Sequence, residues 1–112
     1  MDQGERQQIY DDFRDAVNMA PDELEDWLGT DESRSVGQTR EGEKEAVGHK
    51  SGRRIVEIKH TRKDDLTDED YAHMKKVVGY VHRHLANGGP DQDTEHSDWR
   101  YSLMNWGHDP LK

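Results

Sequence analysis

Apolar residues recur at helical spacing in the N-terminal quarter of the chain. Between residues 5 and 18 they fall at positions i, i+1, i+4, i+7 and i+8, as Ile9, Tyr10, Phe13, Ala16 and Val17. This spacing predicts an amphipathic helix over 5–18 with acidic side chains on its outer face. A proline at 21 followed by two acids predicts the first turn of a second helix, over 21–28, which ends before a glycine.

The pattern then fades between Gly29 and Ser51. The only apolar residues there are Val36, Ala46 and Val47, scattered among glycines and alternating charges. No face of this stretch carries enough apolar surface to be buried, so we expect a long central loop over 29–51. Such a loop is either functional or simply flexible, and flexibility is the simpler interpretation.

A second apolar segment starts after Ser51, a residue type that commonly caps helices. Ile55, Val56 and Ile58 follow it, and three β-branched residues also suit a strand. Strict alternation fails at Ile55-Val56 and no partner strand is evident elsewhere. The sequence therefore favours a helix over 52–62.

The clearest element is a helix over 68–86. Thr67 and Asp70 have the spacing of a capping box, and Asn87-Gly88 provides a C-terminal stop. The apolar positions between them follow spacings of 3, 4, 3 and 4, at Tyr71, Met74, Val78, Val81 and Leu85. We expect this helix to be the central element of the fold.

The C-terminal part combines a polar linker with a short aromatic helix. The linker spans 88–98, and Asp98 as a cap, with Trp99, Leu103 and Trp106 at i, i+4 and i+7, predicts a helix over 98–106. The whole chain, 1–112, is therefore predicted to be all-α, a small single-domain bundle of about five helices with a long central loop.

Composition leaves disorder open as an alternative, because only 29% of the residues are hydrophobic and the formal net charge is −9. Three tryptophans and four tyrosines argue for a folded domain, since such side chains bury large areas. The lack of cysteine excludes disulfides, thiolate metal sites and cysteine nucleophiles. With neither a leader nor a long apolar run, we expect a cytoplasmic protein that does not enter a membrane.

Charge is distributed unevenly along the chain. The first 45 residues hold 14 acidic and 5 basic side chains, whereas nine of the sixteen Lys and Arg residues lie between Lys50 and Arg83. These cations suggest weak DNA binding, directed mainly at backbone phosphates, for a small nucleic-acid-associated protein. The candidate phosphate-binding residues are Arg53, Arg54, Lys59, Arg62, Lys63, Lys75, Lys76 and Arg83. The alternative is that these cations pair with the acidic N-terminal residues of the same chain.

Other chemistry has little support in the sequence. His73, Tyr80 and His84 share one ridge of the 68–86 helix, at the margin of its apolar stripe, while Ala72 and Gly79 form a small-residue face that would allow close approach. Histidine spacing discourages a metal site, and no cofactor motif, nucleophile elbow or paired carboxylates appear. We interpret the serines at 33 and 51 as ordinary loop and cap residues, and predict that the protein is not an enzyme.

The aromatic C-terminus supports a second hypothesis. Either it docks on the 68–86 helix, with His108 and Asp109 closing the end of the last helix, or it forms an exposed surface. In the second case Trp99, Tyr101, Trp106 and His108 would contact a protein partner or a second copy in a homodimer. The protein would then be an interaction or stress-related accessory module.

Four strings resemble an uncharacterised microbial family catalogued as domain of unknown function three-one-four-zero. They are ELEDWLGTDES at 23–33, SGRRIVEI at 51–58, DYAHMKKVVGYVHRHL at 70–85 and WRYSLMNWGHDPLK at 99–112. The resemblance covers nearly the whole chain and implies no catalytic residue. Since members sometimes carry an automatic label of DNA-binding protein, it also implies an association with nucleic acid.

Overall fold

The protein is helical throughout most of its length, which confirms the predicted all-α class. A computed structural model describes residues 1–37 and 45–112. These residues form α1 (Gln3–Ala16), α2 (Pro21–Leu28), α3 (Asp31–Ser35), α4 (Val47–His60), η1 (Lys63–Asp65), α5 (Asp68–Ala86), η2 (Thr94–His96) and α6 (Asp98–Asn105). Within the described ranges, no helix has the length and apolar character needed to span a membrane.

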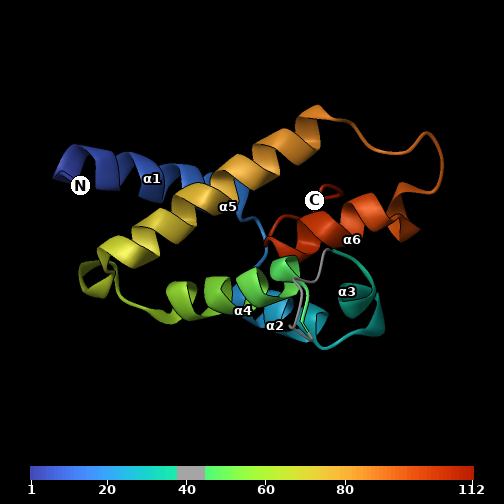
Figure 1. Cartoon of the computed structure of the whole chain (residues 1–112), viewed down its shortest axis with the longest axis horizontal. Coiled ribbons are helices and arrows are strands. Elements are labelled where there is room, and N and C mark those ends of the chain that lie inside the picture. The colour runs from blue at the N-terminus through green and yellow to red at the C-terminus, as the bar shows by residue number, and fades with distance from the viewer. Residues whose placement is uncertain (38–44) are drawn as a thin grey trace.

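The fold consists of two helix pairs joined by the last helix. α1 packs along α5, and α2 packs along α4. α6 lies beside the second pair and the C-terminal half of α5, and it contacts α2, α3, α4 and α5 (Figure 1). The core runs through both pairs because each helix turns its apolar stripe toward this junction.

Local signals placed several helix ends correctly. α2 and α5 have the predicted bounds, and α5 starts with the expected capping box: Thr67 Oγ1 accepts from the Asp70 backbone, and Asp70 accepts from the Thr67 backbone. α1 starts earlier than expected because Asp2 caps it. Ser97, not Asp98, caps α6 through the backbone N–H of Arg100.

The predicted loop over 29–51 is wrong on both sides of residues 38–44, which lie outside the described part. Thr30 caps α3, whose Ser33 is fully buried. α4 begins at Val47, five residues before the predicted start, so Ser51 is a buried residue within the helix and not its cap. The sequence does not predict the first turn of α4, because this turn has no side-chain cap and includes Gly48, a poor helix former.

The buried face of α5 is wider than the predicted stripe. Val77 is fully buried, Val78 is only half-buried and Leu85 is 37% exposed. The reason is that α5 packs against α1 on one side and against α4 and α6 on another. A stripe at coiled-coil spacing describes contact with one neighbour only.

Close helix approach occurs on α4, where the sequence did not suggest it. A Cβ atom added at Gly52 would lie 2.6 Å from the backbone oxygen of Asn105, and one added at Gly48 would lie 2.9 Å from Nε1 of Trp106. These two glycines let α6 pack against the backbone of α4. By contrast, a Cβ at Gly79 would lie 3.3 Å from the flexible end of Arg83, and no other described residue comes within 4 Å, so no described helix packs closely on the predicted small-residue face of α5 there.

Candidate anion-binding groove

A groove of about 340 Å³ lies between α4 and α5 and gathers part of the basic segment. The wall on α4 carries side chains at helical spacing, and α5 contributes the opposite wall. The full lining is Val47, Lys50, Ser51, Arg53, Arg54, Glu57, His73, Lys76 and Trp106. Four of these side chains are cations and one is an acid.

Two of the four cations already have partners in the protein. Arg53 donates through Nε to Glu45 at 2.9 Å and through Nη2 to the other oxygen of that carboxylate. Arg54 donates to Asp70 at 3.0 Å. These pairs are partly exposed and fix side-chain direction more than they stabilise the fold.

Lys50 and Lys76 are the other two cations of the groove. Neither forms an ion pair with any residue in 1–37 or 45–112, and both are exposed. They stand on opposite helices along the same hollow. An anion lying in the groove would therefore meet unpaired positive charge from both walls.

A serine and a histidine meet at the base of the groove. Ser51 Oγ and His73 Nε2 are hydrogen-bonded at 2.9 Å. Burial lowers the pKa of His73, and the charges of Arg54 and Lys76 lower it further, so the ring is neutral at pH 7. Within the described residues no carboxylate bonds to His73, because Asp70 is taken up by Arg54 and Thr67. Among the described residues, no third group orients this pair in the way that a base is oriented beside an activated serine.

The predicted ridge of α5 takes part in a row of stacked rings. The Trp106 ring lies 6.4 Å from that of His73 and 4.2 Å from that of Tyr80. Tyr80 in turn lies 5.3 Å from His84, and His84 lies 6.2 Å from Trp99. Burial raises the pKa of Tyr80 and lowers that of His84, whose Nε2 atom is buried and has no hydrogen-bond partner among the described residues. The row docks the C-terminal aromatics on α5.

Three of the predicted phosphate-binding lysines face other parts of the chain. Lys59 Nζ donates to the backbone oxygens of Val17 and Met19 at 3.4 and 3.2 Å, and burial lowers its pKa. Lys63 bonds to a glutamine of α1 and lies 4.8 Å from the Tyr10 ring centre. Lys75 borders a hollow shared with acidic side chains of α1. The partners of Lys59 and Lys63 are backbone, amide and ring groups of the N-terminal part, and among the described residues none of the three lysines forms an ion pair with an N-terminal acid, so the alternative of pairing with those acids is not observed for them.

The eight predicted cations are thus divided by the fold. Arg53, Arg54 and Lys76 share the groove, whereas Arg62 and Arg83 are exposed outside it. Lys50 belongs to the basic segment but is not among the eight predicted phosphate-binding residues. With α4 starting at Val47, Lys50 falls on the same face as Arg53 and Arg54, at i+3 and i+4.

The four aromatic C-terminal candidates contact their own chain. Trp106 is 5% exposed, and Trp99 Nε1 donates to the backbone oxygen of His84 at 3.1 Å. Tyr101 packs on the Trp27 ring at 5.4 Å, and His108 Nδ1 bonds to the backbone oxygen of Ala16 at 2.7 Å. His108 therefore closes two helices: its ring bonds to the end of α1, and its backbone N–H donates to the backbone oxygen of Leu103 at 3.0 Å, which closes α6 as predicted.

Asp109 was predicted to close the last helix through hydrogen bonds. It accepts two bonds from the guanidinium of Arg100 on α6, both at 3.1 Å, and its backbone N–H donates to Asn18 Oδ1 at 2.8 Å. The segment after α6 is thereby held against both α6 and the α1–α2 connection.

Comparison with known families gives one match. A family model described as protein of unknown function (DUF3140) matches residues 12–104, which is most of the chain and includes the whole groove except Trp106. Comparisons with curated proteins and with solved structures found no significant match.

Proposed function

Because this chain belongs to the DUF3140 family, whose function is unknown, we propose a function from its groove. The protein is a small non-enzymatic nucleic-acid-associated protein that binds DNA weakly, through backbone phosphates held between α4 and α5. The observation that carries this proposal is the presence of Lys50 and Lys76 on opposite walls, both without an ion pair among the described residues.

The net charge of −9 is compatible with this function because an anion in the groove meets the local charge rather than the total charge of the chain. The groove lining carries four cations and one acid, and electrostatic interactions between exposed charges fade beyond about 10 Å at physiological salt. Glu45 and Asp70 offset two of the arginines, so the attraction is modest. Weak binding with strong salt dependence is therefore expected.

The number of available cations sets the expected salt dependence. If the groove neutralises about three phosphates, log K falls with log salt at a slope of about −3 on duplex DNA. Affinity should then fall by about 50-fold between 50 and 200 mM NaCl, with a dissociation constant of about 100 μM near physiological salt.

Fluorescence anisotropy with labelled single-stranded and duplex oligonucleotides tests this proposal. The double variant Lys50→Glu/Lys76→Glu should bind at least about tenfold more weakly than the wild-type protein at low salt. The matched control is Arg62→Glu/Arg83→Glu, which changes net charge equally at exposed positions outside the groove.

The two variants separate the groove from the basic segment as a whole. Equal losses of DNA affinity in both variants would mean that the overall charge of the protein, and not the groove, determines DNA binding. No binding of either oligonucleotide by the wild-type protein at low salt would refute the function altogether.

The contacts give less support to the second hypothesis, an interaction module built on the aromatic C-terminus. Its four side chains pack on α1, α2 and α5 of the same chain and are buried or half-buried. Recruiting them to a partner would require α6 to leave its place, so we retain the groove as the functional surface.

A further inference from the structure

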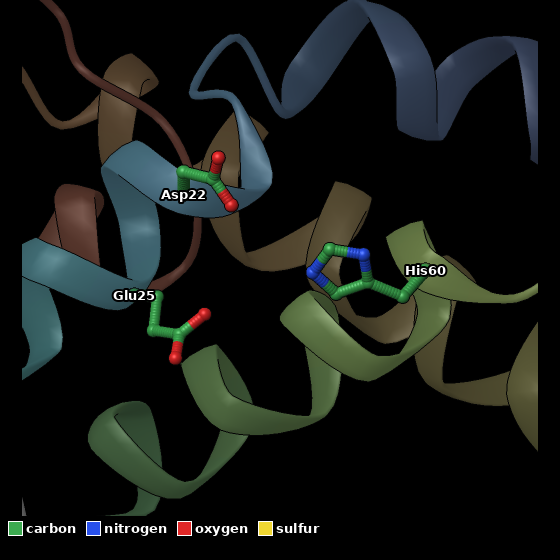
Figure 2. A group of neighbouring side chains, drawn as sticks. All are labelled: Asp22, Glu25 and His60. Carbon is green, nitrogen blue, oxygen red and sulfur yellow. The ribbon is translucent and has the colours of Figure 1, made fainter.

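Three metal-ligating side chains from two helices meet on the surface, away from the groove lining. Asp22 and Glu25 project from α2, and His60 is the last residue of α4. Figure 2 shows the imidazole of His60 turned toward α2, opposite the two carboxylates. One ligand atom from each residue can be chosen so that all lie within 4.8 Å of one another.

The backbone holds these residues in this arrangement. Asp22 and Glu25 are three positions apart, so they lie on one face of α2, and the packing of α2 along α4 brings that face to His60. All three side chains are exposed, and none forms a hydrogen bond or ion pair in the described part of the chain. Their ligand atoms are therefore free to rotate without breaking an interaction.

The spacing matches what a metal ion would need after a small adjustment. Ligand atoms at about 2.0–2.2 Å from a tetrahedral ion are about 3.3–3.6 Å apart. Rotation about the side-chain bonds of exposed Asp, Glu and His residues covers the remaining distance at little cost. Without an ion, two carboxylates at this spacing repel each other.

We propose that Asp22, Glu25 and His60 bind one divalent transition-metal ion of the zinc class, with water completing its coordination. Two carboxylates balance the charge of the ion, and an imidazole nitrogen favours zinc, nickel or cobalt over calcium and magnesium. Calcium requires six to eight oxygen ligands, which three exposed side chains do not provide. The bound ion bridges α2 to the C-terminal end of α4.

The metal site and the DNA-binding groove differ in their residues and in their ligand. None of the three side chains lines the groove between α4 and α5. The spacing of histidines and carboxylates within single helices argues against a metal site, but these three ligands come from two helices. The contact between α2 and α4 supplies the set, and DNA binding is not needed for it.

Isothermal titration of untagged, chelator-treated protein with ZnCl₂ tests the site. The wild-type protein should bind one equivalent, and His60→Ala should lose at least about tenfold in affinity, with a similar loss in Asp22→Asn/Glu25→Gln. His82→Ala and His96→Ala are the matched controls, since both histidines are exposed and lie outside the cluster. These controls should bind zinc as the wild-type protein does.

Two further measurements make the outcome decisive. Cobalt should give an absorption band that His60→Ala lacks, and zinc should raise the melting temperature of the wild-type protein but not of that variant. Far-UV circular dichroism of His60→Ala should match the wild-type spectrum, because the side chain is exposed. The proposal is overturned by a lack of saturable zinc binding, by equal binding in His60→Ala, or by a preference for calcium or magnesium.

Discussion

Asn105 offers the sharpest test of how this small fold is stabilised. The residue ends α6 and is 1% exposed. Its Oδ1 atom accepts from Trp27 Nε1 at 2.8 Å and from Ser33 Oγ, and its Nδ2 atom donates to the backbone oxygen of Ser33 at 2.9 Å. One side chain thus joins α6 to both α2 and α3.

Asn105→Ala should cost about 3–5 kcal/mol in the free energy of unfolding. The substitution removes three hydrogen bonds, and each buried group left without a partner costs about 1–3 kcal/mol. The two groups of Ser33 are fully buried and stay unsatisfied, whereas Trp27 is half-buried and can regain water. A loss of this size is a large fraction of the about 5–15 kcal/mol that stabilises a typical domain.

Ser33→Ala is the matched variant for this network. It removes one hydrogen bond but leaves Asn105 Oδ1 still bonded to Trp27, so we expect a loss of about 1 kcal/mol. The double variant should lose less than the sum of the two, because both substitutions break the same bond.

Urea unfolding followed by far-UV circular dichroism measures all three variants and avoids the fluorescence of Trp27 itself. If Asn105→Ala lowered the free energy of unfolding by less than about 1.5 kcal/mol, the loss would be no larger than that of one ordinary hydrogen bond. That result would refute the role of Asn105 as a buried link between three helices. Strict additivity in the double variant would refute the shared network.

Four further substitutions test the helix packing and two titratable side chains. In urea unfolding, Gly52→Ala should lower the free energy of unfolding by about 2–3 kcal/mol, because its Cβ would meet a backbone oxygen. Gly79→Ala should raise the free energy of unfolding by about 0.5–1 kcal/mol, because alanine is the better helix former. Stabilisation by both substitutions would contradict the close approach of α6. Burial lowers the pKa of His84 in the folded protein below the value of 6.5 that it has in the unfolded chain. The unfolded chain therefore binds a proton more readily, and the folded protein loses stability as the pH falls from 6.5 toward the lower pKa. His84→Phe should therefore reduce the loss measured between pH 7 and 5, and an unchanged pH slope would contradict this. Burial raises the pKa of Asp109, but its bonds to Arg100 and the Leu111 N–H outweigh burial and lower it overall. Asp109→Asn should cost about 2–3 kcal/mol at pH 7, and the difference from wild type should disappear as the pH falls below 3.8; a difference that persists there would rule out the ion pair as its cause.

Several features of the fold were predictable from the sequence because their signals are local. Pro21 at the start of α2, the Thr67–Asp70 box and the Asn87-Gly88 stop each act within one helical turn, and they placed two helices at their observed bounds. The shared ridge of His73, Tyr80 and His84 followed from helix geometry alone, and those rings do stack with the C-terminal aromatics.

Only the tertiary structure decided which residues of different helices meet. α3 and the first turns of α4 carry weak local signals, and they form because Ser33 and Gly52 fit against α6. The same contacts divided the predicted cations, leaving Arg54 and Lys76 in one groove while Lys59 was covered by the N-terminal helices. The sequence determines which charged and metal-ligating side chains are present. The partners of each side chain come from distant segments, and only the packing of the helices brings those segments together.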